Sequence, residues 1–188
     1  MGYAIAETIA DLGAKVILIS GPTSLSINHP SITLINVTSA QEMFDASVKH
    51  FPECDGAVMS AAVADFTPVV TETRKVKRGK KNYFIELTPT QDIAAELGQQ
   101  KQNHQLLVGF ALETNDEGAN ARKKLVKKNL DFIVLNSLND PGAGFQHDTN
   151  KITIIDQQNK TQHFELKSKK DVAIDIVNKI IEELEKIP

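Results

Sequence analysis

Small side chains followed by a carboxylate come directly after one apolar segment of the chain. Residues 56–59 are apolar, and the next residues are Ser60-Ala61-Ala62-Val63-Ala64-Asp65-Phe66. Small residues let a flat or charged ligand approach the backbone, and Asp65 can accept hydrogen bonds from a sugar or a base. The alternative interpretation is a tightly packed turn between a strand and a loop.

Basic side chains gather in two further places. Lys75 and Lys77 alternate with Val76, so both ammonium groups point to one side of an extended arm that could close over phosphates. Lys124 and Lys128 are four residues apart in a helical segment, so they share a face that could hold a polyanion. A solvated surface is the alternative for both. A nucleic-acid site is not supported, because no aromatic residues are interleaved with the basic ones.

Two polar residues stand where predicted elements begin or end. Asp92 precedes a helical segment and can cap its N-terminus. Asn136 follows an apolar strand, where its amide could meet a ligand. The five histidines are scattered, and the single cysteine excludes a cysteine-rich zinc site, so no metal site is predicted. A glycine fingerprint and a Walker A loop are also missing, so a nucleotide site would be nonstandard.

Alternating strands and helices must position these residues. Segments of about ten residues with helical periodicity separate short apolar runs, which predicts parallel strands joined by right-handed crossovers. Ligands then bind beyond the carboxyl ends of the strands. The predicted strands are 15–19, 32–37, 56–59, 83–87, 106–110 and 132–135, and the predicted helices are 1–12, 40–50, 92–100 and 118–128.

The last part of the chain predicts an antiparallel addition to this sheet. Residues 151–155 and 163–166 lie on either side of residues 156–160, which predicts a hairpin with a five-residue loop. A final helix is capped by Ser168 and carries one apolar stripe, which we expect to pack on the sheet. The fold class is therefore α/β, with a mostly parallel sheet and a C-terminal antiparallel hairpin.

Composition places the chain among ordinary globular proteins. Its 188 residues suit one domain, and a net charge of -3 disfavours a role in coating nucleic acid or acidic membranes. A single cysteine suits a reducing compartment, and we expect no membrane span and a cytoplasmic location. Because a helix comes first and a buried strand follows, we expect an N-terminal truncation that removed an earlier strand and turn.

The order of these pieces resembles one family, the phosphopantothenate-cysteine ligases (phosphopantothenoylcysteine synthetases) of coenzyme A biosynthesis, especially the bacterial CTP-dependent kind. The matching segments are Met1-Gly2-Tyr3-Ala4-Ile5-Ala6-Glu7, Gly13-Ala14-Lys15-Val16, Ile19-Ser20-Gly21-Pro22, Ala61-Ala62-Val63-Ala64-Asp65-Phe66, Lys75-Val76-Lys77, Asp92-Ile93, Val108-Gly109-Phe110-Ala111-Leu112-Glu113-Thr114 and Lys124-Leu125-Val126-Lys127-Lys128-Asn129-Leu130-Asp131.

The resemblance implies a Rossmann-like three-layer sandwich and a two-step reaction. The carboxylate of 4'-phosphopantothenate attacks the α-phosphorus of CTP to give an acyl-cytidylate and pyrophosphate, and the amine of L-cysteine then displaces CMP. Mg²⁺ accompanies the triphosphate, and this domain carries no flavin. The implied partners are CTP, 4'-phosphopantothenate, L-cysteine, a second copy in a homodimer, and a decarboxylase that is fused or associated.

The resemblance also implies roles for residues. Lys75 lies on a catalytic flap that also contacts the nucleotide. The other implied nucleotide contacts are Ala61, Ala62, Asp65, Asp92, Ile93, Ala94, Ala95, Phe110, Lys124 and Lys128. We add Asn136 as a candidate substrate contact. Residues 1–188 would form a single ligase domain with a dimerisation arm at about 66–87. The strand and the Gly/Ser-rich, asparagine-bearing turn that precede the first helix in this family have no counterpart in these residues.

Two other function classes remain open at the level of sequence. A nicotinamide-dependent Rossmann oxidoreductase would need the missing glycine fingerprint. A noncatalytic nucleotide-binding or dimerisation module would use the same lysines to hold phosphate without releasing pyrophosphate.

Overall fold

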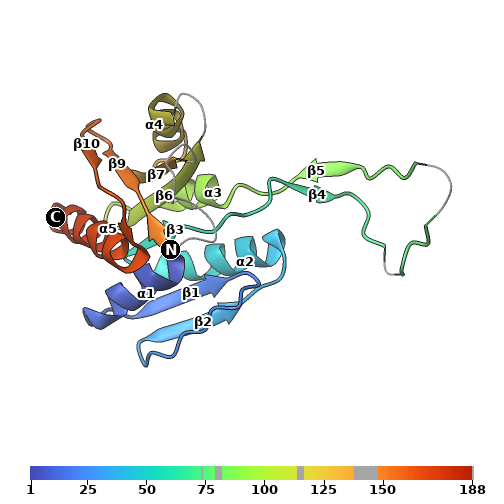
Figure 1. The fold of residues 1–188 in the computed structure, drawn as a ribbon, viewed down its shortest axis with the longest axis horizontal. Coiled ribbons are helices and arrows are strands. Elements are labelled where there is room, and N and C mark those ends of the chain that lie inside the picture. Colours follow the sequence, from blue (N-terminus) through green and yellow to red (C-terminus); the bar gives the residue numbers. More distant parts are fainter. Residues whose placement is uncertain (73, 79–81, 114–116, 138–147, 188) are drawn as a thin grey trace.

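The computed structural model describes residues 1–72, 74–78, 82–113, 117–137 and 148–187 (Figure 1). Its helices are α1 (Gly2–Asp11), α2 (Ala40–His50), the short 3-10 helix η1 (Phe51–Glu53), α3 (Ile93–Gln100), α4 (Glu117–Lys127) and α5 (Lys169–Leu184). Its strands are β1 (Val16–Ser20), β2 (Ile32–Asn36), β3 (Gly56–Met59), β4 (Phe66–Pro68), β5 (Leu87–Pro89), β6 (Leu106–Glu113), β7 (Phe132–Ser137), β8 (Thr149–Asn150), β9 (Ile152–Asp156), β10 (Thr161–His163) and β11 (Lys167–Ser168).

The central sheet has the strand order β10-β9-β7-β6-β3. β3, β6 and β7 are parallel, whereas β9 and β10 extend the sheet as an antiparallel hairpin. β1 and β2 form a separate parallel pair, and β8 pairs with β11. This arrangement confirms the predicted α/β class with a mostly parallel sheet and an antiparallel C-terminal edge.

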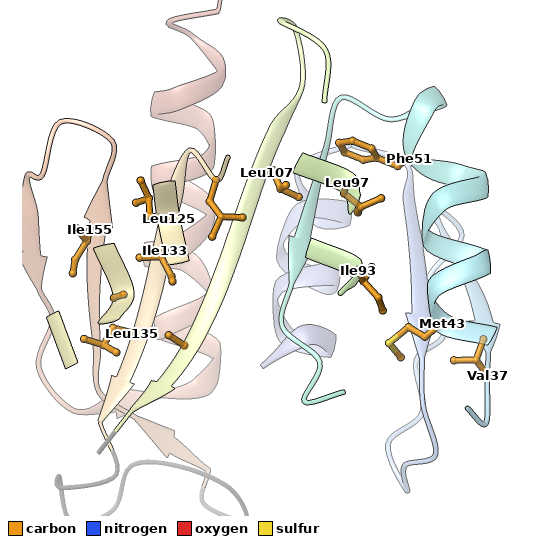
Figure 2. Close-up of a cluster of buried hydrophobic side chains, with 13 residues drawn as sticks. Val37, Met43, Phe51, Ile93, Leu97, Leu107, Leu125, Ile133, Leu135 and Ile155 are labelled. Carbon is orange, nitrogen blue, oxygen red and sulfur yellow. The ribbon is translucent and has the colours of Figure 1, made fainter. Parts of the chain in front are cut away.

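Helices cover both faces of the central sheet, which gives three layers. One apolar cluster lies under α2, α3 and α4, and Figure 2 shows its members, including Met43, Leu97 and Leu125. The second cluster lies under α1 and α5 and includes Ile5 and Ile176. The apolar stripe of the last helix therefore packs on the sheet, as its periodicity predicts.

The predicted ends of several helices are confirmed by local contacts. Gly13 follows α1 with φ +94°, a left-handed conformation that glycine adopts without strain. Ser39 and Glu42 form a capping box at the start of α2, where the predicted helix 40–50 begins. Ser168 accepts a hydrogen bond from the Asp171 N–H and caps α5.

Two predicted strands are wrong in their position. The predicted strand 83–87 is replaced by β5, which pairs with β4 in a short antiparallel ribbon. Residues 83–86 find no core to pack against, and Phe84 is 86% exposed. In the C-terminal hairpin, the predicted strand 163–166 is replaced by β10. The Asp156 carboxylate closes the loop by accepting from the backbone N–H groups of Gln158 and Lys160, so pairing already begins at Thr161.

The ribbon of β4 and β5 extends away from the three layers (Figure 1). Thr67 pairs with Thr88, and the Val69 N–H donates to the Glu86 carbonyl at 3.0 Å. We call residues 66–89 the arm. Its exposed apolar side chains are Phe66, Val69, Val70, Val76, Tyr83, Phe84, Ile85 and Leu87.

Candidate functional site

Thr90 holds the loop after β3 against the beginning of α3. Its N–H donates to the Asp65 carbonyl at 2.9 Å, and its hydroxyl donates to the Ala64 carbonyl at 2.7 Å. Because Thr90 is two residues before Asp92, these bonds place Asp65 close to the start of α3. Ala61, Ala62 and Asp65 are exposed there, so this small-residue loop is open to a ligand.

Asp92 joins the start of α3 to the end of α4. Its Oδ1 accepts the Ala95 N–H at 3.1 Å and the Lys128 ammonium at 3.0 Å. Burial raises the pKa of Asp92, but the hydrogen bonds from Lys128 and Ala95 and the charges of Lys128 and Lys127 outweigh it, so this pKa is lowered overall. The predicted cap of α3 is therefore confirmed, and the carboxylate also binds a predicted phosphate-binding lysine.

Close packing between α3 and α4 supports this ion pair. A Cβ atom at Gly98 would collide with the Lys128 carbonyl oxygen, so only glycine allows the two helices to approach here. The Asn129 amide donates to the Gly98 carbonyl at 2.9 Å. Although α4 ends at Lys127, the Lys128 N–H still donates to the Lys124 carbonyl at 3.0 Å. Helical geometry therefore continues to Lys128, so Lys124 and Lys128 lie on one face of the helix, as their spacing predicts.

Phe110 and Asn136 lie on the other face of the sheet. Alternate residues of a strand point to opposite faces. Leu135 packs in the cluster under α2, α3 and α4, whereas Phe110 and Val134 pack in the cluster under α1 and α5. Asn136 follows the alternation of Val134, so it lies on the α1–α5 face. The structure therefore places these two residues on the opposite face of the sheet from α3 and α4.

The beginnings of α1 and α5 approach this second face at the carboxyl ends of the strands. A Cβ atom on Gly2 would lie 2.7 Å from the Ser60 hydroxyl, which follows β3. Met1 and Ala4 pack against the same apolar cluster as Val172 and Ala173, so the starts of α1 and α5 are neighbours. Helix N-termini and lysines make a positive surrounding for an anion.

Asn150 binds Asn136 at the end of β7. Its Nδ2 donates to the Asn136 Oδ1 at 3.0 Å, and its own Oδ1 accepts the Lys151 N–H at 3.1 Å. Asn150 is 2% exposed, and Asn136 is half-buried. Sequence reasoning missed Asn150, because a lone asparagine 14 residues from its partner gives no periodic signal.

Lys75 is exposed and lies within the arm, between β4 and β5. The structure therefore does not bring Lys75 to Asp92 and Lys128, since the arm extends away from the three layers (Figure 1). A cavity of about 310 Å³ lies elsewhere, along α1, and none of the predicted site residues lines it. Its lining residues are Ala4, Glu7, Thr8, Asp11, Asn28, His29 and Lys170.

Neither a metal centre nor a membrane span is found among the residues that the structure describes. Within those ranges, no three His, Cys, Asp or Glu side chains are grouped to hold a metal ion. No helix there is long and apolar enough to cross a membrane.

A comparison with protein-family models decides the family. Residues 1–184 match the model described as the DNA/pantothenate metabolism flavoprotein C-terminal domain, or DFP. The chain belongs to this family. The family resemblance predicted from the sequence is therefore confirmed over almost the whole chain.

Two relatives and one solved structure place the chain within the DFP family. It is 44% identical over 180 residues to the coenzyme A biosynthesis bifunctional protein CoaBC of Bacillus subtilis, a match that covers 96% of this chain and 44% of that protein. The crystal structure of the C-terminal domain of a CoaBC protein aligns with a TM-score of 0.82 at 38% identity, and covers 98% of this chain and 82% of that one. This likeness confirms the Rossmann-like DFP fold.

The second relative carries a different name. It is a cysteine/cysteine sulfinic acid decarboxylase of an unknown prokaryotic organism, 58% identical over 181 residues, which are 96% of this chain and 50% of that protein. The chain thus spans about half the length of these DFP relatives. A structure of a Cab2 mutant in complex with phosphopantothenate-cysteine has the same fold, with a TM-score of 0.79 at 16% identity over 98% of this chain and 77% of that one.

Proposed function

We propose that this domain is a phosphopantothenate-cysteine ligase of coenzyme A biosynthesis. It joins 4'-phosphopantothenate to L-cysteine through an acyl-cytidylate and uses CTP. The observation that carries the proposal is the match along nearly the whole chain to the C-terminal domain of CoaBC, at 38% identity. The decarboxylase name of one relative describes a protein twice as long, so we assign that activity to a region outside this domain.

The face of α3 and α4 supports a nucleotide site. Asp65 and the beginning of α3 offer hydrogen-bonding groups to the sugar and base, together with Ala61, Ala62, Ile93, Ala94 and Ala95. Lys124 and Lys128 supply positive charge for the triphosphate, since charge-assisted bonds to phosphate are strong. Mg²⁺ enters with the nucleotide as part of the substrate. The described residues offer it no cluster of carboxylates, so phosphates and water would hold it.

The face of α1 and α5 supports a site for the phosphorylated acyl substrate. Asn136 offers a hydrogen-bonding amide at the edge where the parallel strands end, and Phe110, which we propose as a nucleotide contact, packs on the same side of the sheet. The starts of α1 and α5, with Lys169 as the first residue of α5, favour an anion on this side. The substrate carboxylate would then meet the nucleotide α-phosphorus at this edge of the sheet.

The arm supports two further proposals. Its exposed apolar side chains suit burial against a second copy, so we propose that the arm forms a homodimer. Lys75 on the same arm would then reach the nucleotide and neutralise charge that develops on phosphoryl oxygens. A fused or associated decarboxylase and a cytoplasmic location complete the proposal. They rest on the relationship to CoaBC, which is named as bifunctional.

We also propose that one further strand completes the site. β1 pairs with β2 on one side, and β3 pairs with β6 on one side. The second edges of β1 and β3 could both pair with a strand inserted in parallel between them. The turn after that strand would lead to Gly2 at the start of α1, beside Ser60. This is where the family places an asparagine-bearing turn.

Pyrophosphate release tests the proposed function. The complete protein is given Mg²⁺ and 4'-phosphopantothenate with either CTP or ATP, before and after addition of L-cysteine. We expect pyrophosphate with CTP, then amide and CMP once cysteine is added. Nucleotide binding without pyrophosphate release would favour the noncatalytic module instead. A change of NADPH fluorescence on titration would favour the oxidoreductase.

A further inference from the structure

We propose that Thr90 is a positioning residue that joins the two ends of the arm and thereby directs the Asp65 carboxylate toward the nucleotide. This inference rests on the proposed function and deepens it, because it names a residue outside the predicted contacts that sets the affinity for the nucleotide. We call the two hydrogen bonds from Thr90, to the carbonyls of Ala64 and Asp65, the latch.

The latch connects segments that the arm separates in sequence. Asp65 is the last residue before the arm, and Thr90 is the first residue after it. The Thr90 hydroxyl donates to the Ala64 carbonyl at 2.7 Å, across 26 positions of the chain, and the Thr90 N–H donates to the Asp65 carbonyl at 2.9 Å. One residue therefore closes the base of the ribbon that extends away from the three layers (Figure 1).

The two accepting carbonyls lie on either side of the Asp65 Cα atom. Peptide groups are planar, so the backbone at Asp65 can turn only about φ and ψ. The Ala64 carbonyl belongs to the peptide plane before this Cα atom, and the Asp65 carbonyl belongs to the plane after it. Because the latch holds both planes, it restrains φ and ψ of Asp65 and with them the direction of the Cα–Cβ bond.

The hydroxyl supplies a bond that the ribbon's backbone cannot make. Hydrogen-bonded and non-bonded pairs alternate along antiparallel strands. The bonds from Thr90 to Asp65 and from Val69 to Glu86 fall on the bonded pairs of this ribbon. Ala64 is one position beyond Asp65, where the alternation gives its carbonyl no backbone donor from the opposite strand. The Thr90 side chain provides that donor instead.

Burial contributes little to holding this loop. The alanines between β3 and Asp65 are exposed, whereas Val63 is half-buried against the cluster under α2, α3 and α4. Little burial is therefore available to offset the entropy lost when the backbone is ordered. Thr90 is also two residues before Asp92, which caps α3 and binds Lys128. The latch thus places Asp65 relative to the proposed phosphate-binding side of the same site.

Thr90→Val removes the hydroxyl but keeps the shape of the side chain and the backbone N–H. Asp65 then spends less time in the orientation that binds the nucleotide, and the apparent affinity falls by the same factor. Losing one hydrogen bond should raise the KM for CTP in the complete protein about fivefold. We expect kcat and the KM for 4'-phosphopantothenate to stay within about twofold of the wild-type values.

Two matched variants separate the hydroxyl from the shape of the side chain. Thr90→Ser keeps the hydroxyl, so its KM for CTP should lie within about twofold of the wild-type value. Thr88→Val makes the same substitution two residues earlier, at an exposed threonine of β5, and should leave this KM unchanged. The inference would be overturned by equal rises in Thr90→Val and Thr88→Val, by no rise in Thr90→Val, or by a Thr90→Ser variant as weak as Thr90→Val.

A double-mutant cycle tests whether Thr90 acts through Asp65. Asp65→Ala removes the carboxylate that the latch directs, and kcat/KM for CTP can still be measured below saturation. In that background, Thr90→Val should lower kcat/KM by less than about 1.5-fold, because residues that act as one unit are not additive. A merely structural role would instead give the same loss, about fivefold, in both backgrounds. That result would contradict the proposed positioning.

Hydrogen exchange on the chain without ligand tests the latch whether or not the ligase proposal holds. The hydroxyl bond lies beside the Thr90 N–H bond, so its loss should make the base of the arm open more often. We expect the protection of the amide at position 90, relative to its intrinsic rate, to fall about fivefold in Thr90→Val. The Val69 N–H, bonded to Glu86 further along the ribbon, is the internal control and should change little.

The two kinds of failure can be told apart. Unchanged protection at position 90 in Thr90→Val would contradict the latch, whatever reaction the protein performs. A wild-type protein that makes no product would contradict the proposed function, while the exchange result would still decide whether Thr90 holds the loop.

Discussion

At the scale of single residues, Asp92 shows how one carboxylate can serve two elements. It caps α3 through the Ala95 N–H and binds the Lys128 ammonium. Asparagine caps a helix about as well as aspartate but carries no charge, so the two roles can be separated by substitution.

We expect Asp92→Ala to lower the free energy of unfolding by about 1 kcal/mol, because both the cap and the ion pair are lost. Asp92→Asn should lose much less, since its amide oxygen can still accept the Ala95 N–H. Chemical denaturation of both variants checks this. An equal loss in the two would mean that charge, rather than capping, dominates at this position.

Lys75 gives the second residue-scale prediction. Its side chain is exposed on the arm, so we expect Lys75→Gln to leave the melting temperature unchanged. If it neutralises charge during the reaction, amide formation by the complete protein should fall by about 100-fold or more. Lys77→Gln on the same arm is the control, with little expected change. Near-normal turnover in Lys75→Gln would contradict the proposed role.

At the scale of elements, short sequence motifs predict the helix ends that are set by hydrogen bonds between neighbouring residues. Ser39 with Glu42 and the glycine at position 13 are visible in the sequence, and the helix boundaries that depend on them are confirmed. The position of β5 was missed, because the apolar residues 83–86 have strand propensity but no neighbouring strand. Asn150 was missed because its role depends on a partner from another strand. Contacts between distant segments leave no such signal.

The arm provides a prediction about association. Phe84 is 86% exposed, and a large aromatic side chain exposed among other apolar side chains is typical of a surface that binds another protein. We expect Phe84→Ser to shift the protein from dimer to monomer in size-exclusion chromatography with light scattering, without loss of monomer helix content. Val126→Ser is a control on α4, where the side chain is 78% exposed. A wild type that is monomeric at high concentration would contradict the dimer proposal.

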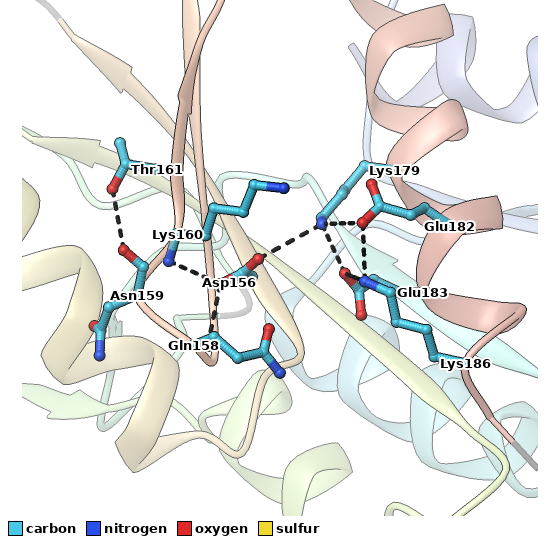
Figure 3. A network of polar contacts seen from close by, with 9 residues as sticks. All are labelled: Asp156, Gln158, Asn159, Lys160, Thr161, Lys179, Glu182, Glu183 and Lys186. Atoms are coloured by element: carbon cyan, nitrogen blue, oxygen red, sulfur yellow. Dashed lines mark hydrogen bonds and ion pairs between the residues drawn. The ribbon is translucent and has the colours of Figure 1, made fainter.

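The contact between α5 and β9 depends on a buried cation. Lys179 is 4% exposed and lies 3.6 Å from Asp156, 3.1 Å from Glu182 and 2.7 Å from Glu183 (Figure 3). Lys186 binds the same two glutamates from the surface. Hydrogen bonds from Lys186 and then Lys179 lower the pKa of Glu182 to about 2.

We expect Lys179→Met to lower the free energy of unfolding by about 3 kcal/mol, because it leaves Asp156 buried without its cation. Lys186→Met should have little effect. Since the folded pKa of Glu182 lies below its ordinary value of 4.5, its contribution is present above pH 4.5 and is lost as the pH falls toward 2. Denaturation between pH 6 and about pH 2.5 should show a smaller acid-dependent loss in Lys179→Met than in wild type.

At the scale of the whole molecule, β1 and β3 each have one edge without a partner strand among the described residues, and a strand between them would join the two sheets into one. Along a strand, the backbone N–H and C=O groups of successive residues point alternately to the neighbouring strand on one edge and to the one on the other edge. Val16 and Ser20 bond toward β2, and the Leu106 N–H donates to the Asp55 carbonyl. Ile17 and Ile19 of β1, and Val58 of β3, therefore present their N–H groups to the space between β1 and β3.

Hydrogen exchange can test whether a parallel strand occupies that space. In this chain the amide hydrogens of Ile17, Ile19 and Val58 should exchange rapidly. In a longer protein with a strand before α1, at least two of them should be protected more than about tenfold, because they gain partners. The Leu18 amide, which faces β2, serves as the control and should change little. Equal exchange in both proteins would mean that β1 and β3 are edges in their own right, and that the proposed site is built without a strand between them.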